Sequence, residues 1–341
     1  MFFLSAKQPR RIRVIENTLT QRRTVSTLFW GMRYGINDFM GLLPKLDSNT
    51  TTGELKRLIN AGLVVQSDAS HYLLTAAGAA WVHKAFHQFD YHEGVKMNAR
   101  FNLRQFRSRF LLAVQIVSEF SYQNSHYYPM LINDREDQFI KQWFHHFKSK
   151  ALVNELTSLL NAFLSGMSDQ LAYQFSTILN GHSTTGMTIF QQAAKFKSPV
   201  APRLVDEWQL FSCLVKFITI HQNDYPSLVS LLNGTQRSLV SNSAQQTYQM
   251  FLNRPQIDWI ARARRIKLST VREHLLEVAI LIPRTNAYFQ RQFDHSIWQY
   301  LESTYHGNID DWQFSTIKNQ FSNFDYFYFR MYQILRSHVD E

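Results

Sequence analysis

Residues 245–280 constrain the fold more than any other stretch of this chain. In this stretch, short segments with apolar residues at helical spacing alternate with residues that end a helix. Thr247 to Leu252 predict a first short helix, and Pro255 breaks it just past its end. Two more helices are predicted from apolar residues at helical spacing. These residues are Ile257, Ile260 and Ala261 for the second helix, and Val271, Leu275 and Val278 for the third. The pattern predicts a helix-turn-helix, which is a module for binding nucleic acid or a partner rather than a catalytic site.

The third helix is expected to begin at Ser269, whose hydroxyl can accept a hydrogen bond from the backbone N–H of Arg272. Its apolar stripe faces inward, so its polar residues fall on the outer face, where a recognition helix meets base edges or phosphates. The residues expected to point outward are Thr270, Arg272, Glu273, His274 and Glu277.

Positive charge is concentrated in the same segment. Six lysines and arginines lie between Arg254 and Arg272, and only Asp258 opposes them. Such a patch attracts duplex DNA, because each phosphate contact releases condensed counterions. The alternative is a solvated helix surface without a ligand. The candidate DNA contacts are Arg262, Arg264, Arg265, Lys267, Ser269, Thr270, Arg272 and His274.

The sequence IARARRIKLSTVREHL resembles the helicase-type helix-turn-helix domain at the C-terminus of many bacterial RecQ-family helicases. In that family an Ile-Ala pair precedes an arginine-rich turn and a recognition segment that ends in His-Leu. The matching residues here are Ile260, Ala261, Arg264, Ser269, Thr270, Val271, His274 and Leu275. The resemblance extends over about the last hundred residues and implies DNA as a ligand.

The remainder of the chain is similar to YpbB-like proteins, a standalone version of this architecture. The similarity at the N-terminus rests on RRTVSTLFWGMRYGINDFMGLL, an arginine-rich start followed by two helical segments. Members of that family lack helicase motifs and are encoded beside a RecQ-type helicase. The resemblance therefore implies a non-catalytic accessory factor whose partners are DNA and that helicase.

A second DNA-binding-like element is predicted near the N-terminus. Apolar residues at helical spacing up to Leu63 are followed by two short strands, at Val64–Val65 and at Tyr72 to Leu74, with a polar turn between them. A further helix is expected at Ala79 to Phe86. Helix, hairpin and helix in this order resemble a winged helix. Winged helices bind proteins as well as duplexes, so both ligands stay open.

Residues 90–238 are predicted to form helices joined by turns. One helix carries a basic stripe of Lys96, Arg100, Arg104 and Arg107, repeating every three or four residues without acidic neighbours to compensate it. This stripe is a possible additional DNA contact, and a solvated helix face is the alternative.

The sequence contains no complete motif of a catalytic or metal-binding site. Gly181 to Thr188 is spaced like a phosphate-binding loop, but Met187 replaces the lysine that would reach the β and γ phosphates. Thr188 is better explained as the entry to a helix. His83 and His87 are four residues apart, but no H-E-x-x-H or Cys-x-x-Cys accompanies them. We therefore expect no enzyme activity, no metal, no other cofactor and no small-molecule substrate.

Composition agrees with a protein that binds polyanions in the cytoplasm. The formal net charge is +10, and the isoelectric point is near 9.6. Cys213 is the single cysteine, so no disulfide framework is possible and a buried structural thiol is expected. The sequence shows neither a secretory signal nor an apolar run long enough to span a membrane. A cytoplasmic location is therefore expected.

The expected fold is mainly α, with a winged-helix-like domain at 1–90, a helical middle domain at 91–238 and the helix-turn-helix domain at 239–341. The expected function is a DNA-binding accessory factor that helps to place a RecQ-type helicase during repair or replication. One alternative is a transcriptional regulator, which should dimerise and prefer one sequence. Another is a protein-only adaptor, which should bind the helicase at high salt and bind no DNA alone.

Overall fold

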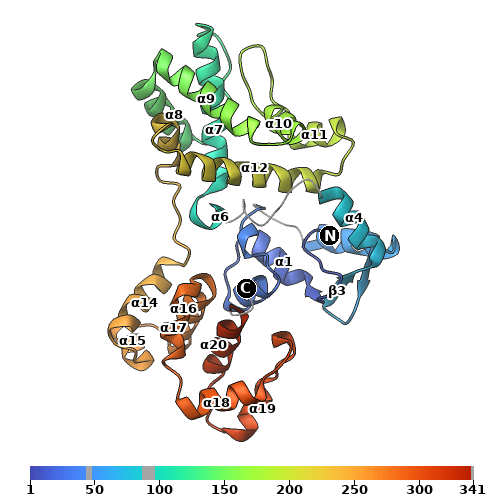
Figure 1. The fold of residues 1–341 in the computed structure, drawn as a ribbon, viewed down its shortest axis with the longest axis vertical. Coiled ribbons are helices and arrows are strands. Elements are labelled where there is room, and N and C mark those ends of the chain that lie inside the picture. The colour runs from blue at the N-terminus through green and yellow to red at the C-terminus, as the bar shows by residue number, and fades with distance from the viewer. Residues whose placement is uncertain (44–47, 87–96, 339–341) are drawn as a thin grey trace. The chain divides into compact units, whose positions relative to one another are not determined.

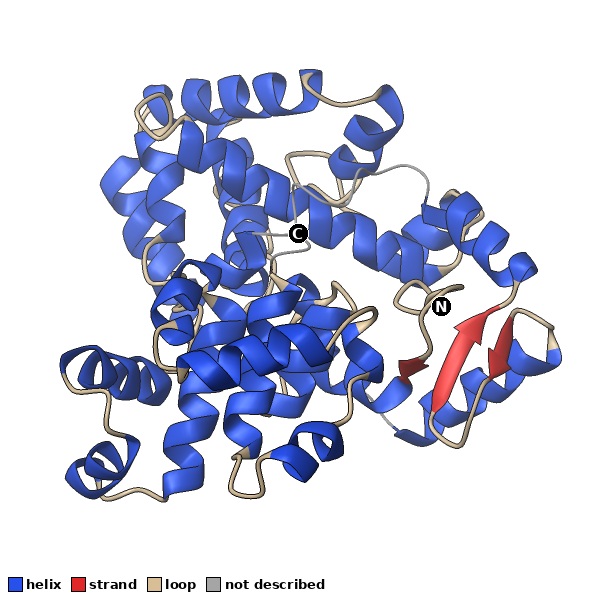
Figure 2. Cartoon of the chain, turned by 60° about the horizontal axis from the view of Figure 1, so that its bottom comes forward, coloured by secondary structure: helices blue, strands red, loops and turns tan. Residues whose placement is uncertain are grey.

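A computed structural model describes residues 1–43, 48–86 and 97–338 of the chain (Figure 1). The predicted fold class is confirmed, because helices dominate and the strands form one small sheet (Figure 2). The chain divides into two compact units. The first contains residues 1–7, 55–65 and 74–237, and the second contains residues 8–54, 66–73 and 238–341. This division differs from our three consecutive segments, mainly because residues 8–54 group with the C-terminal part.

The helices of the first unit include two long ones, α7 (Leu103–Ser121) and α12 (Val200–Ile220). The others are α4 (Ala76–Phe86), α6 (Met97–Arg100), α8 (Asp134–Phe147), α9 (Lys150–Ser165), α10 (Asp169–Ser176), α11 (Ile189–Lys195), α13 (Pro226–Val229) and the 3-10 helix η2 (Ser230–Leu232). Three of these helices have an N-cap side chain that accepts a hydrogen bond from a backbone N–H of the first turn. The N-cap residues are Asn102 for α7, Asn133 for α8 and Ser149 for α9.

The core of the first unit is aromatic. Phe106 and Phe110 of α7 meet Phe211 of α12 edge-to-face, with ring centroids 6.4 and 6.3 Å from it. Phe175 of α10 packs on the same ring at 5.5 Å, and all four side chains are fully buried. Large rings in mutual contact bury much apolar area each, so this cluster fixes how the helices of the unit cross.

The second unit contains β1 (Arg10–Arg11), α1 (Ile12–Leu19), α2 (Val25–Arg33) and the 3-10 helix η1 (Asn37–Phe39) from the N-terminal part. From the C-terminal part it contains α14 (Asn242–Asn253), α15 (Ile257–Arg264), α16 (Leu268–Leu281), η3 (Pro283–Thr285), α17 (Asn286–Gln290), α18 (His295–Thr304), η4 (Ile309–Asp311), α19 (Phe314–Gln320) and α20 (Tyr326–Ser337).

Helix α16 is the centre of the second unit, where it packs against α14, α15, α20 and α2. Val271, Leu275 and Val278 of α16 are completely buried, as the spacing predicts. Leu28 and Phe29 of α2 belong to the same core and are each 1% exposed. An N-terminal helix therefore completes the core of the helix-turn-helix.

The helix–hairpin–helix order predicted near the N-terminus is confirmed as α3 (Ser48–Asn60), β2 (Val64–Gln66), β3 (His71–Leu74) and α4. Strand β1 joins β3 antiparallel, so the sheet order is β1-β3-β2. Helix α4 begins three residues before the predicted Ala79, because Thr75 caps it by accepting from Gly78 N at 3.0 Å. Gly78 is required there, since a Cβ would lie 2.0 Å from the carbonyl oxygen of Leu63.

Candidate nucleic-acid interface

The helix-turn-helix is formed by α14, α15 and α16 within the second unit. Helix α14 is longer than the predicted Thr247 to Leu252, because Ser241 caps it by accepting from Ala244 N at 3.2 Å. Ala244 is completely buried, and its small side chain gave little signal in the apolar pattern. The predicted α15 and the predicted inner face of α16 are both confirmed.

The turn between α15 and α16 is made without glycine. Arg265 adopts the left-handed conformation, with φ +54°. Its N–H donates to the carbonyl of Arg262 at 3.2 Å, and the N–H of Ile266 donates to Ala261 at 3.0 Å. These bonds satisfy the last carbonyls of α15. The backbone of Arg265 thus closes the helix, while its side chain is exposed.

Helix α16 begins earlier than predicted. Lys267 is the N-cap residue, and it makes no side-chain capping bond. The expectation that Ser269 caps the helix is wrong, because Ile266 and Leu268 both pack against the core and so fix the turn two residues earlier. The positive end of the helix dipole is therefore not neutralised by a capping side chain, which leaves it suited to an anion.

Arg264 is held inside the helix-turn-helix. Its guanidinium donates to the carbonyl of Ser243 at 2.7 Å, to the hydroxyl of the same residue at 3.0 Å and to Gln246 Oε1 at 3.1 Å. It also contacts the hydroxyl of Thr247, which is completely buried. Arg264 thus joins the end of α15 to the start of α14, and few of its donors remain for a phosphate.

His274 completes this internal group. Its Nδ1 lies 2.7 Å from the hydroxyl of Thr247 and 3.4 Å from the guanidinium of Arg264. Burial lowers the pKa of His274, and the charge of Arg264 lowers it further. The negative charges of Glu277 and Glu273 raise this pKa, but by less. A neutral imidazole in this position supports the packing of α14 on α16.

Two further polar residues of α16 are engaged within the unit. Arg272 forms an ion pair with Asp325, the N-cap residue of α20. Glu277 is only 7% exposed and accepts from Arg23 at 2.8 Å and from Ser241 N at 2.7 Å. The expectation that Glu277 points outward is therefore wrong, because this carboxylate ties α16 to the segments before α2 and α14.

The remaining predicted contacts lie together at one end of the motif. Arg262, Arg265, Lys267 and Ser269 are exposed, and Thr270 is half-buried beside them. We call Arg262, Arg265, Lys267 and Ser269 the basic edge. It combines three cations with the uncapped start of α16, and Glu273 lies exposed one turn further along the helix. This geometry can hold phosphate groups near the N-terminus of a recognition helix.

The basic stripe of the first unit is partly neutralised. Lys96 lies outside the described residues. Arg100 and Arg104 are exposed, whereas Arg107 forms an ion pair with Glu207 of α12. The expected absence of acidic neighbours is thus wrong, because an acid distant in sequence meets the stripe. Sequence reasoning also missed Arg109, which is 3% exposed and pairs with Glu136 of α8.

The loop spaced like a phosphate-binding motif has a structural explanation. Thr188 is the N-cap of α11 and forms a capping box with Gln191, so its predicted role as a helix entry is confirmed. A Cβ on Gly186 would lie 2.5 Å from the carbonyl oxygen of Ile178, which explains the glycine. Over the described ranges, no three histidines, cysteines or acidic residues gather in a way that could hold a metal. No helix among these residues has the length and apolarity to cross a membrane.

Comparisons with known proteins agree with this geometry. Residues 243–333 match the family model of a helix-turn-helix domain. The chain is also similar to Protein YpbB of Bacillus subtilis (strain 168), with 23% identity over 257 residues, which covers 72% of this chain and 70% of that protein. No solved structure matches the chain. A helix-turn-helix domain of this kind suggests DNA binding.

Proposed function

We propose that this chain binds DNA through the basic edge. The observation that carries the proposal is the exposure of Arg262, Arg265 and Lys267 around the uncapped start of α16. Each cation that meets a phosphate releases counterions, and the helix N-terminus adds its dipole to the same site. The match to a helix-turn-helix domain supports this proposal.

A salt titration tests the DNA contact. The variant Arg262→Gln/Arg265→Gln/Lys267→Gln removes three charges and leaves the apolar face of α16 intact. If the protein contacts about four to six phosphates, the log–log slope of affinity against salt is about −4 to −5, and the variant is shallower by about 2 to 3. The variant Lys56→Gln/Arg57→Gln is the control, because it removes two exposed charges from α3 and should change the slope less. An affinity independent of salt contradicts the proposal and favours the protein-only adaptor.

We further propose that the protein is a non-catalytic accessory factor of a RecQ-type helicase. The resemblance of IARARRIKLSTVREHL to the helicase-type domain supports this role. An accessory factor should prefer forks or single-strand junctions and show little sequence bias. Competition between a forked DNA and random duplexes, followed by helicase assays with and without the protein, tests it. Strong preference for one duplex sequence supports the transcriptional regulator instead.

The non-catalytic part of the proposal has its own test. The loop at 181–188 lacks a lysine, and its Thr188 is occupied as a helix cap. The purified protein should release no phosphate from ATP with forked DNA present and should unwind nothing. Measurable turnover that disappears in Thr188→Val contradicts this expectation, and the same substitution in Thr157 of α9 controls for preparation effects.

A further inference from the structure

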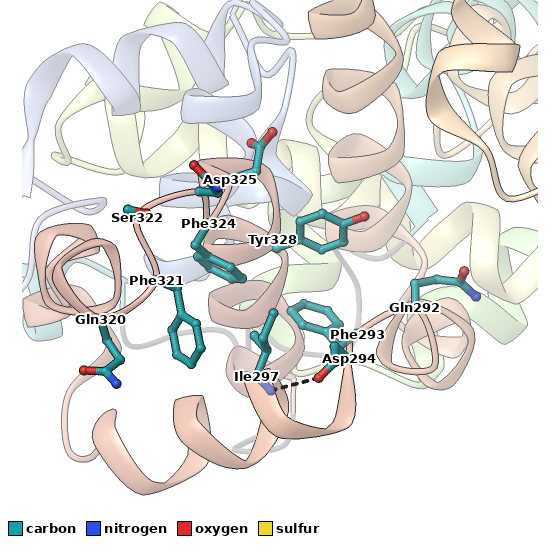
Figure 3. Close-up of a pocket in the computed structure, with 11 residues that line it drawn as sticks. Gln292, Phe293, Asp294, Ile297, Gln320, Phe321, Ser322, Phe324, Asp325 and Tyr328 are labelled. Carbon is teal, nitrogen blue, oxygen red and sulfur yellow. Dashed lines mark hydrogen bonds between the residues drawn. The ribbon is translucent and has the colours of Figure 1, made fainter.

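A cavity of about 610 Å³ opens within the second unit, between the start of α18 and the connection from α19 to α20 (Figure 3). Its volume falls in the range of pockets that hold small organic groups. Four aromatic rings and one aliphatic side chain form its apolar surface. These residues are Phe293, Ile297, Phe321, Phe324 and Tyr328.

The aromatic surface is held by ring contacts around the cavity. Phe293 meets Tyr328 edge-to-face, with centroids 5.5 Å apart, and Phe324 lies 6.3 Å from the same ring. Phe321 packs edge-to-face on Tyr300 at 5.1 Å and is half-buried. Figure 3 shows Phe293, Phe321 and Phe324 near one another, with the side chains of Gln292, Gln320 and Asp325 farther out. The rings are thus preorganised to stack on a flat ligand.

The two carboxylates at the rim are already engaged. Asp294 accepts from the N–H of Ser296 at 2.9 Å at the start of α18. Asp325 accepts from Phe327 N at 2.9 Å and pairs with Arg272. The rim also carries the amides of Gln292, Gln320 and Asn323. Carboxylates repel a phosphate, whereas aromatic rings and amides suit a flat, uncharged group with hydrogen-bonding edges.

One residue of the cavity rim contacts α16. Asp325 lines the cavity and pairs with Arg272, which lies one turn after Ser269 of the basic edge on α16. The side chain of Arg272 therefore joins α16 to the rim of the cavity. Phosphates would meet the basic edge, and a base attached to them would meet the rings.

We propose that this cavity receives one unpaired base of the DNA that the basic edge holds. The inference rests on the proposed DNA binding and narrows its ligand to duplex with an unpaired nucleotide. Stacking on aromatic rings is tolerant of sequence, because every base has a π-face. The cavity would thus give the protein a preference for junctions over continuous duplex without a preference for sequence.

Fluorescence anisotropy with two DNAs tests the inference: a fully paired duplex, and the same duplex with a short single-stranded extension. The wild-type protein should prefer the extended DNA. Phe321→Ala should weaken binding of the extended DNA roughly tenfold and leave the duplex unchanged, since stacking on one aromatic ring has an effect of this size. Phe314→Ala is the matched control, because Phe314 begins α19, Phe321 follows its end, and both pack against the same apolar cluster, but Phe314 does not line the cavity.

Phe321→Leu with Phe314→Leu repeats the comparison with less loss of volume, should either alanine variant fail to fold. A 2-aminopurine at the unpaired position gives a direct signal, because its fluorescence should change on binding to the wild type and not to the Phe321 variants. Equal binding of both DNAs by the wild type, or equal preference in Phe321→Leu and wild type, overturns the inference and leaves DNA binding intact. Failure of the wild type to bind either DNA overturns the proposed function together with this inference.

Discussion

The guanidinium of Arg23 lies 2.8 Å from the carboxylate of Glu277, so a residue 254 positions earlier in the chain holds α16. The same guanidinium donates to the carbonyl of Leu239 at 2.7 Å. Glu277 also accepts from the N–H and hydroxyl of Ser241. One ion pair therefore fixes α16 relative to the residues that precede both α2 and α14.

We expect Arg23→Ala to lower the free energy of unfolding by about 1–3 kcal/mol, because it leaves a nearly buried carboxylate without its cation. The side chain of Arg23 is 25% exposed, which places the loss below that of a fully buried pair. Denaturant unfolding followed by circular dichroism measures the effect. Arg22→Ala, at an exposed neighbour, should change stability by less than about 0.5 kcal/mol. Equal effects of the two substitutions would show that the pair does not stabilise the unit.

The helix-turn-helix could be predicted from the sequence because its signal is local. Ile257 and Ile260 lie at helical spacing in one segment, as do Val271 and Leu275 in the next, and Ile260, Val271 and Leu275 are completely buried. The contribution of α2 could not be predicted in this way, since periodicity shows which face of a helix is apolar but not what covers it. Leu28 and Phe29 pack in the same core as α16, and this contact depends on the tertiary fold.

The sequence also could not predict which of the candidate DNA contacts are exposed. Arg264 and Arg265 are neighbours with identical side chains, and their charge gave no way to distinguish them. The structure places the first among hydrogen-bond acceptors of α14 and the second in solvent. Which arginine points inward depends on the left-handed turn at Arg265, and a turn without glycine has no strong sequence signal.

This difference predicts opposite outcomes for two single substitutions. Arg264→Ala should lower the free energy of unfolding by about 1–3 kcal/mol, because acceptors on α14 lose their donor. Arg265→Gly should leave stability within about 1 kcal/mol, since glycine adopts the left-handed conformation readily and this offsets its extra freedom in the unfolded chain. Thermal unfolding of both variants and the wild type measures this.

Arg265→Gly should still weaken DNA binding and make its salt dependence shallower by about one unit, because a phosphate contact is lost. Titration at several salt concentrations checks this. Stability loss in Arg265→Gly, together with unchanged DNA affinity, would reverse the roles that we assign to the two arginines.

Two buried tyrosines of the second unit, Tyr305 and Tyr332, differ in the hydrogen bonds of their hydroxyl groups. Tyr332 is completely buried and stacks on Trp312 at 5.6 Å, and its hydroxyl has no hydrogen-bond partner among the residues described. Burial raises the pKa of Tyr332 to about 12. Tyr305, in contrast, donates to the carbonyl of Gln313 at 2.7 Å and accepts from Ile317 N at 3.2 Å.

Tyr332→Phe should therefore raise the free energy of unfolding by about 1 kcal/mol, because it removes a buried polar atom that has no partner. Tyr305→Phe should lower it by about 1–2 kcal/mol, because two hydrogen bonds are lost. Chemical denaturation with tyrosine and tryptophan fluorescence compares the two. Equal losses in both variants would mean that the Tyr332 hydroxyl is bonded in solution.

The last prediction concerns pH. Burial and then the charge of Arg264 lower the pKa of His274 below its usual 6.5. The unfolded chain therefore binds a proton at this residue more readily than the folded one. Stability from this group is present above pH 6.5 and decreases as pH falls from there toward the lowered pKa of the folded state. Protonation would place a second cation beside Arg264, 3.4 Å from its guanidinium, and should loosen α14 from α16.

Unfolding free energies measured between pH 7.5 and pH 5.5 check this prediction. His274→Asn keeps an acceptor near the position of Nδ1 for Thr247 and Arg264 but does not titrate, so its stability should depend less on pH than that of the wild type. His295→Asn is the control, because His295 is exposed at the start of α18 and should leave the wild-type dependence unchanged. If the His274 and His295 variants follow the same curve, the loss of stability in acid arises elsewhere, and the packing of α14 on α16 does not depend on a neutral imidazole.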